Sequence, residues 1–145
     1  MDLNKAFLPR PEDIKERWIT IDASGKTVGR LATEISNIMR GKNLAITTPS
    51  VKTGPRVIII NAEKVFLSGI KMEDKEYRKY TGYRGNCKHF TSKDLFNDNP
   101  TYILKHAIKG MMRKNKMDRQ IFEDLLIYSG DKHPHIAQAQ AKAKN

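Results

Sequence analysis

With 145 residues, 39% of them hydrophobic, the chain is long enough for a single domain with a genuine core, which excludes wholesale disorder. Its 27 Lys and Arg against 16 Asp and Glu give a net charge of +11, which indicates a nucleic acid or another anionic surface as the partner. The one cysteine, Cys87, excludes an internal disulfide, and no apolar run approaches the ~20 residues of a membrane span, so we expect a cytoplasmic protein.

Strand-like and helix-like segments alternate along the chain, behind an extended arm over residues 1–15 that lacks the character of a signal peptide. In chain order we expect a strand at 18–21, a helix at 27–39, strands at 57–60 and 65–67, a helix at 91–97, a basic helix from Pro100, a helical piece at 118–124 and a strand at 125–128. Residues 70–90 have the polar composition of a loop. This alternation indicates one α/β domain over 16–136 with a small, mostly parallel sheet of about four strands, and a frayed tail over 137–145.

The stretch 100–119 is the most distinctive part of the sequence. In its first half, apolar residues recur every four positions, which places them on one face of a helix. Basic residues recur at the same spacing and lie beside that apolar face. Only Asp118 opposes six basic residues, which are Lys105, Lys109, Arg113, Lys114, Lys116 and Arg119. A solvated helix face usually mixes both signs of charge, so we expect phosphate groups to neutralise this ridge.

The turn 25–27, Gly-Lys-Thr, lies between a strand and a helix, where a phosphate-binding loop would lie. The full loop needs a glycine five residues before Gly25, and that position is Thr20. We therefore expect the turn to be too short to wrap a nucleoside triphosphate. The helix start, with Lys26, Thr27 and Arg30, is expected to hold one backbone phosphate instead.

Residues 77–89 interleave tyrosines with basic residues and two glycines. Tyrosines stack on bases, arginines fit phosphates, and glycines let the backbone approach a ligand, so the pattern favours nucleic acid over an ordinary surface loop. Cys87 with His89, and His133 with His135, are too few and too separated for a zinc site, so we expect no metal and no cofactor. The histidines at 133 and 135 are expected to hydrogen-bond phosphate or backbone.

Several segments, in their order and spacing, resemble the bacterial large-ribosomal-subunit protein L13 family over Trp18 to about Gln138. The segments are Asp22-Ala-Ser-Gly-Lys-Thr-Val-Gly-Arg-Leu-Ala32, Arg40-Gly-Lys42, Ile60-Asn-Ala-Glu-Lys64, Gly69 with Lys71, Thr81-Gly82 with Gly85, Ile108-Lys-Gly-Met111, Arg119, Tyr128-Ser-Gly130 and His133-Pro-His135. Arg113 and Asp118 depart from the family pattern. The resemblance implies a three-layer α/β/α fold, no enzymatic activity, direct binding of 23S-type ribosomal RNA and early entry into the assembling subunit. It also implies neighbouring ribosomal proteins as partners, and no homo-oligomer.

We therefore interpret the sequence as a structural constituent of the large ribosomal subunit, held to folded RNA by charge and shape. The side chains expected to bind RNA are Lys26, Thr27, Arg30, Arg40, Lys42, Lys71, Tyr80, Gly82, Tyr83, Arg84, Lys105, Lys109, Arg113, Lys114, Lys116, Arg119, His133 and His135. Two alternatives stay open: a small nucleotide-binding α/β enzyme that uses the 25–27 turn, and a general DNA-binding protein.

Overall fold

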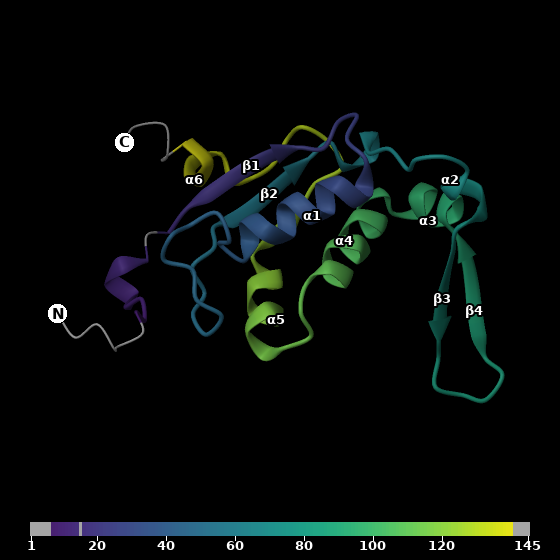
Figure 1. The fold of residues 1–145 in the computed structure, drawn as a ribbon. Coiled ribbons are helices and arrows are strands. Elements are labelled where there is room, and N and C mark those ends of the chain that lie inside the picture. The colour runs from purple at the N-terminus through teal and green to yellow at the C-terminus, as the bar shows by residue number, and fades with distance from the viewer. Residues whose placement is uncertain (1–6, 15, 141–145) are drawn as a thin grey trace.

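A computed structural model describes residues 7–14 and 16–140, and it combines a parallel sheet, helices and a separate hairpin (Figure 1). Its elements are η1 (Pro11–Asp13), β1 (Trp18–Asp22), α1 (Val28–Met39), β2 (Arg56–Ile60), η2 (Ala62–Lys64), α2 (Lys71–Asp74), β3 (Glu76–Tyr80), β4 (Cys87–Thr91), α3 (Ser92–Asp98), α4 (Pro100–Met111), α5 (Lys116–Glu123), β5 (Leu125–Ile127) and α6 (Ile136–Gln140). The expected α/β class with a small, mostly parallel sheet is confirmed.

The main sheet has three parallel strands in the order β1-β2-β5, with β2 in the centre. The sequence of β2 predicted burial on both faces, and Val57, Ile58 and Ile59 are all fully buried. Val57 and Ile59 belong to the main core together with residues of α1 and α4. Ile58 lies outside that cluster because side chains alternate between the two faces of a strand.

Two parts of the β structure differ from the sequence expectation. The segment 65–67 makes only one isolated parallel bridge, between Phe66 and Thr27, so among the described residues the parallel sheet has three strands rather than about four. The stretch expected as a polar loop contains an antiparallel hairpin, β3–β4, that extends away from the sheet (Figure 1). Tyr77 is the only buried residue in β3 and β4. The sequence of these two strands therefore lacks the alternation of apolar and polar residues that would have predicted a hairpin.

The main core is formed where α1 and α4 pack against each other on one face of the sheet (Figure 1). Leu31, Ile35 and Met39 of α1 and Ile108 of α4 are almost completely buried, and burial of each such side chain contributes roughly 1.5–3 kcal/mol. Gly54 passes so close to α1 that a Cβ atom there would lie 1.7 Å from the carbonyl oxygen of Met39. This packing fixes both helices, and with them the basic side chains on their exposed faces.

The opposite face of the sheet meets the C-terminal segment. Trp18 of β1 shares this face with Ile58, and the His135 ring stacks on the Trp18 ring with centroids 5.5 Å apart. The short helix α6 follows at once and lies beside β1, so residues 137–140 are helical where we expected fraying. Residues 141–145 of that expected tail, and 1–6 and 15 of the expected arm, lie outside the described residues. None of the helices described is long and apolar enough to cross a membrane.

Candidate nucleic-acid interface

The connection between α4 and α5 is ordered by the one acidic residue of the basic stretch. Asp118 is only 4% exposed, and its Oδ2 accepts a 2.8 Å hydrogen bond from the backbone N–H of Arg113. The N–H of Asp118 donates in turn to Oδ1 of Asn115, the N-cap residue of α5, across 2.8 Å. The Asp118 carboxylate is therefore used inside the protein, and Glu123 is the exposed acidic residue that remains beside the basic side chains of this region.

Those basic side chains surround a groove between α4 and α5 with a volume of about 650 Å³. Its basic lining residues are Lys109, Arg113, Lys114 and Arg119, and Met112 and Phe122 supply apolar surface. The four cations are exposed, as are Lys105 on α4 and Lys116 at the start of α5. The structure thus places four of the six predicted basic residues around one concave surface that periodicity alone could not reveal. Arg113, which we expected on a helical ridge with Lys105 and Lys109, lies beyond the end of α4 at Met111, in the connection to α5.

A smaller groove of about 200 Å³ joins this region to the end of α1, because Arg113 lines both grooves. Arg40 and Lys42 also line it. The Arg40 guanidinium is half-buried and donates to the carbonyl of Ser36 at 3.1 Å and to Asn37 Oδ1 at 3.2 Å. Arg40 is thus tied to the end of its own helix, whereas Lys42 is exposed.

The start of α1 differs from a nucleotide-binding loop in how its amides are used. The N–H of Gly25 donates to the carbonyl of Lys64 at 3.0 Å, that of Lys26 to Ala23 at 3.2 Å, and that of Val28 to Phe66 at 3.0 Å. Amides engaged in this way cannot wrap a triphosphate. Thr27 is the N-cap residue and its side chain caps none of the first-turn amides, so the first turn of α1 stays open to an anion.

A groove of about 880 Å³ lies beside this first turn. Arg30, Lys71 and Lys75 line it as basic residues, together with the exposed apolar side chains of Phe66 and Ile70. Lys26 lies to one side, with its Nζ 4.0 Å from Glu34 Oε2. The predicted residues Thr27, Arg30 and Lys71 therefore share one surface, and Lys75 is a basic neighbour that the sequence analysis did not single out.

The hairpin carries the predicted aromatic and glycine residues at its tip, well away from the body (Figure 1). Gly82 and Gly85 have φ angles of 96° and 74°, which only glycine adopts without strain. Tyr80 and Tyr83 are 62% and 77% exposed, and Arg84 is exposed as well. Large aromatic rings exposed to this extent are available to stack on bases.

His133 and His135 lie apart from these surfaces, on the sheet face opposite α4. His135 Nε2 lies 3.0 Å from Tyr128 Oη, its backbone N–H donates to His133 Nδ1 at 3.2 Å, and its ring stacks on Trp18. These contacts give both histidines a packing role. Their expected contact with phosphate stays a prediction.

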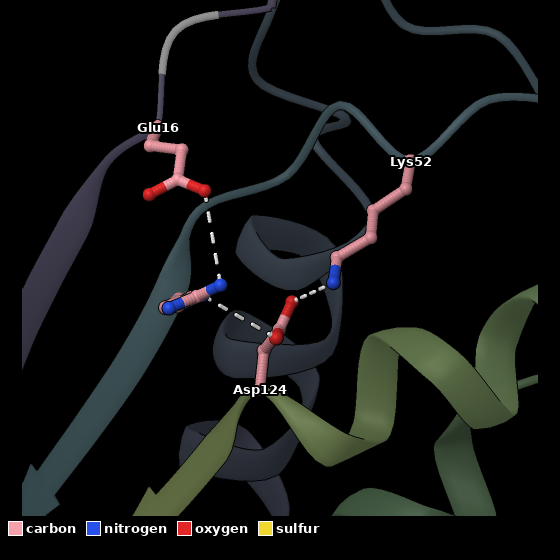
Figure 2. A network of polar contacts seen from close by, with 4 residues as sticks. Glu16, Lys52 and Asp124 are labelled. Atoms are coloured by element: carbon pink, nitrogen blue, oxygen red, sulfur yellow. Dashed lines mark ion pairs between the residues drawn. The ribbon is translucent and has the colours of Figure 1, made fainter.

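Some basic side chains are engaged within the protein, at the end of the sheet where β5 begins. Figure 2 shows Lys52 directed at the Asp124 carboxylate, with Glu16 on the other side of the cluster. Arg56 joins them, with Nε 3.6 Å from Asp124 Oδ1 and Nη2 3.8 Å from Glu16 Oε1, and its guanidinium lies 5.1 Å from the centre of the Trp18 ring. Lys52 and Arg56 are therefore paired with carboxylates of the protein itself, and we do not include them in the candidate interface.

Asp22 controls the turn that leads into α1. Its pKa is lowered to about 2, first by the hydrogen bond from the Ser24 backbone N–H and then by those from the side chains of Asn61 and Ser24. The three hydrogen bonds to Oδ1 measure 3.0, 3.0 and 2.8 Å. A carboxylate held in its charged form is suited to fixing a loop, and nothing in its surroundings suits it to act as an acid or base near pH 7.

Within the described residues, no group of three His, Cys, Asp or Glu side chains is placed to hold a metal ion. A compact α/β body, with basic residues on grooves and helix ends and a protruding aromatic hairpin, defines a class of small basic proteins that bind polyanions through surface shape. The sequence model of the family described as "Ribosomal protein L13" matches residues 16–134. The chain therefore belongs to the ribosomal protein L13 family, whose members are structural ribosomal proteins rather than enzymes.

Individual relatives agree with this assignment. "Large ribosomal subunit protein uL13" of Thermoanaerobacter sp. (strain X514) is 44% identical over 138 residues, which are 95% of this chain and 96% of the relative. The proteins of the same name from Finegoldia magna and Clostridioides difficile are 46% and 41% identical over 134 residues, 92% of this chain and 94% of each relative. The similarity thus extends over the three grooves and the hairpin.

Proposed function

We propose that this chain is a structural constituent of the large ribosomal subunit, where it binds 23S-type ribosomal RNA and supports early assembly of the subunit. The observation that carries the proposal is the match to the family over 16–134, with relatives named "Large ribosomal subunit protein uL13" along nearly their whole length. Its location is accordingly the large subunit in the cytoplasm. Neighbouring ribosomal proteins are its further partners, and it acts as a single copy.

The groove between α4 and α5 is the main RNA-binding surface of this proposal. Lys109 and Arg113 line it where the backbone is fixed by Asp118, so the cations are held in place before RNA arrives. Preorganisation lowers the conformational entropy that binding would otherwise cost. Each phosphate that such a side chain neutralises releases counterions from the RNA, so affinity falls steeply with salt concentration.

The first turn of α1 supplies a second contact. Its open amides and the side chains of Arg30 and Lys71 line one groove, so a single phosphate of the RNA backbone meets several donors there. The hairpin tip supplies the third contact, through base stacking on Tyr80 and Tyr83 beside Arg84. RNA's narrow major groove admits few side chains, so these contacts recognise shape and backbone at junctions and loops.

Nucleotide hydrolysis is the weaker alternative. The amides of Gly25, Lys26 and Val28 are engaged with backbone carbonyls, which leaves the loop unable to enclose a triphosphate. Binding of ATP or GTP by the RNA-free protein would favour this alternative. Equal affinity for duplex DNA and for large-subunit RNA at moderate salt would favour general DNA binding.

The direct test is gradient sedimentation of a cell extract that contains the tagged chain. We expect the chain to sediment with the large subunit, and to leave it only when high salt strips proteins from the RNA. A chain that stays at the top of the gradient at low salt would remove the basis of the proposal.

A further inference from the structure

The register of the hairpin sorts its residues onto two faces of opposite character. Tyr77 pairs with Phe90 and Lys79 with Lys88 on one face, and the alternate residues occupy the other. Directly paired residues in an antiparallel ladder have Cβ atoms about 4.5–5.5 Å apart, so Lys79 and Lys88 hold two positive charges close together. Such like-charged pairs destabilise a hairpin.

The two faces differ in whether their charges are balanced. On the opposite face His89 Nδ1 lies 3.1 Å from Glu76 Oε2, so one carboxylate lies on that face, beside His89 and Arg78 in the ladder. On the lysine face, no acidic side chain of the described residues lies within ion-pair distance of Lys79 or Lys88. Both lysines are exposed. The lysine face thus lacks the counter-charge that the opposite face has.

The lysine face is the one that turns toward α4. Tyr77, on this face, is 8% exposed and packs edge-on against His106, with ring centroids 5.2 Å apart, and against Tyr102 at 6.2 Å. His106 also lines the groove between α4 and α5, one helical turn before Lys109. In Figure 1 the hairpin extends from α2 and α3, α5 lies on the other side of α4, and both lie on the same side of the main sheet. The aromatic contact therefore connects the lysine face of the hairpin with the main cationic groove.

We propose that the lysine face of the hairpin is a further phosphate-binding site, at which the backbone of one RNA strand lies between Lys79 and Lys88. This inference rests on the proposed RNA-binding function and extends it from the hairpin tip to one particular face. A phosphodiester oxygen between the two ammonium groups supplies the missing negative charge and turns a repulsive pair into an attractive one. The same strand continues past His106 into the groove between α4 and α5.

The test compares two substitutions at adjacent positions on opposite faces, Lys79→Ala and Arg78→Ala. Binding to a transcript of bacterial large-subunit ribosomal RNA is measured from 50 to 400 mM salt for both variants and the unaltered chain. Loss of one phosphate contact should reduce the slope of log K against log salt by about 0.7 to 0.9 for Lys79→Ala. Arg78→Ala should leave the slope unchanged. Equal slopes for all three proteins, or equal losses in both variants, would overturn the proposal.

A second variant, Lys79→Glu, separates binding from folding. It replaces a repulsive cross-strand pair by an attractive one, so the melting temperature of the free protein should stay the same or rise while RNA affinity falls. A lower melting temperature with unchanged RNA affinity would make the lysine pair structural and overturn the inference.

Three further results identify which proposal fails. If the unaltered chain does not bind the transcript, the proposed function itself fails. If Lys109→Ala reduces the salt slope and Lys79→Ala does not, only the hairpin site fails. If Lys79→Ala weakens incorporation into the subunit but not binding to the transcript, the lysine face contacts an acidic protein, and the RNA assignment is overturned.

Discussion

Asn61 donates from Nδ2 to Oδ1 of Asp22 across 3.0 Å, and this contact joins the carboxyl ends of β1 and β2. Asn61 adopts a left-handed φ of 56°, which asparagine tolerates better than most residues, and its backbone N–H donates to the carbonyl of Gly130 at 2.9 Å. The same Asp22 oxygen accepts the N–H of Ser24, in the turn before α1. The position of the basic residues at the start of α1 therefore depends on the hydrogen bonds that the Asp22 carboxylate accepts from Asn61 and Ser24.

The first prediction concerns Asp22→Asn and pH. The pKa of Asp22 is lowered from its ordinary 3.8 to about 2, so its contribution to stability is fully present above pH ~4 and is lost as the pH falls through 2. The variant should melt at a lower temperature than the unaltered chain at pH 7, and the difference should shrink between pH 4 and 2. Circular dichroism melting curves at four pH values measure this. Asp131→Asn, at an exposed loop carboxylate, is the control and should show no such convergence.

The second prediction concerns the buried carboxylate of the α4–α5 connection. Asp118→Ala leaves the N–H of Arg113 without its acceptor and should cost about 1–3 kcal/mol in the free energy of unfolding, measured with urea. Asp118→Asn retains an acceptor oxygen and should cost less. RNA affinity should fall in the alanine variant because the cations around the groove lose their fixed backbone. A stability within 0.5 kcal/mol of the unaltered chain for Asp118→Ala would contradict this role.

The third prediction compares two glycines with opposite surroundings. A Cβ at Gly54 would lie 1.7 Å from Met39 O, so Gly54→Ala requires backbone movement and should destabilise by roughly 3 kcal/mol or more. Apart from the adjacent residues and backbone of α4 itself, a Cβ at Gly110 would meet no heavy atom of the described residues within 4 Å, so Gly110→Ala should stabilise by up to about 1 kcal/mol. Thermal unfolding of both variants tests the pair. An unchanged melting temperature for Gly54→Ala would contradict the close approach of the Gly54 loop to α1.

The fourth prediction separates the C-terminal histidines from the RNA-binding surface. His135→Ala removes the ring stacked on Trp18 and the contact with Tyr128 Oη, and it should destabilise by about 1–2 kcal/mol. Affinity for the RNA transcript should stay unchanged at a temperature where the variant is folded. Reduced affinity with unaltered stability would instead support the contact with phosphate that the sequence suggested.

The sequence predicted best where apolar periodicity was strong. The helix at 27–39 and the strand at 57–60 could be predicted from their apolar patterns alone, and Ile35 and Ile59 of these segments are buried in the main core. The hairpin escaped prediction because its strands bury little apart from Tyr77, so charge and aromatic content resembled a loop. Short elements such as α6 give too little pattern to recognise.

The residues of the candidate interface also fall into two groups, those that local sequence patterns predicted and those that depend on tertiary contacts. Helical spacing predicted that Lys105 and Lys109 lie on one face of a helix, because that depends only on local geometry, whereas Arg113 of the same expected ridge lies beyond the end of α4. The burial of Asp118 and the pairing of Lys79 with Lys88 depend on contacts made by tertiary folding and by strand register. Composition and spacing could therefore name the basic residues, but could not say which of them face a common partner.

The central claim is that cations held on a fixed scaffold attach this chain to the large subunit. The double substitution Lys109→Glu with Arg113→Glu tests it, because both residues are exposed and line the same groove. Reversing a charge in the last turn of α4 costs about 1 kcal/mol or less in stability, so the variant should remain folded.

The decisive measurement is the fraction of tagged protein that sediments with the large subunit in a gradient, for the unaltered chain and for the folded double variant. We expect the unaltered chain in the subunit peak and the double variant to be depleted from it. Equal incorporation of the two proteins would contradict this expectation.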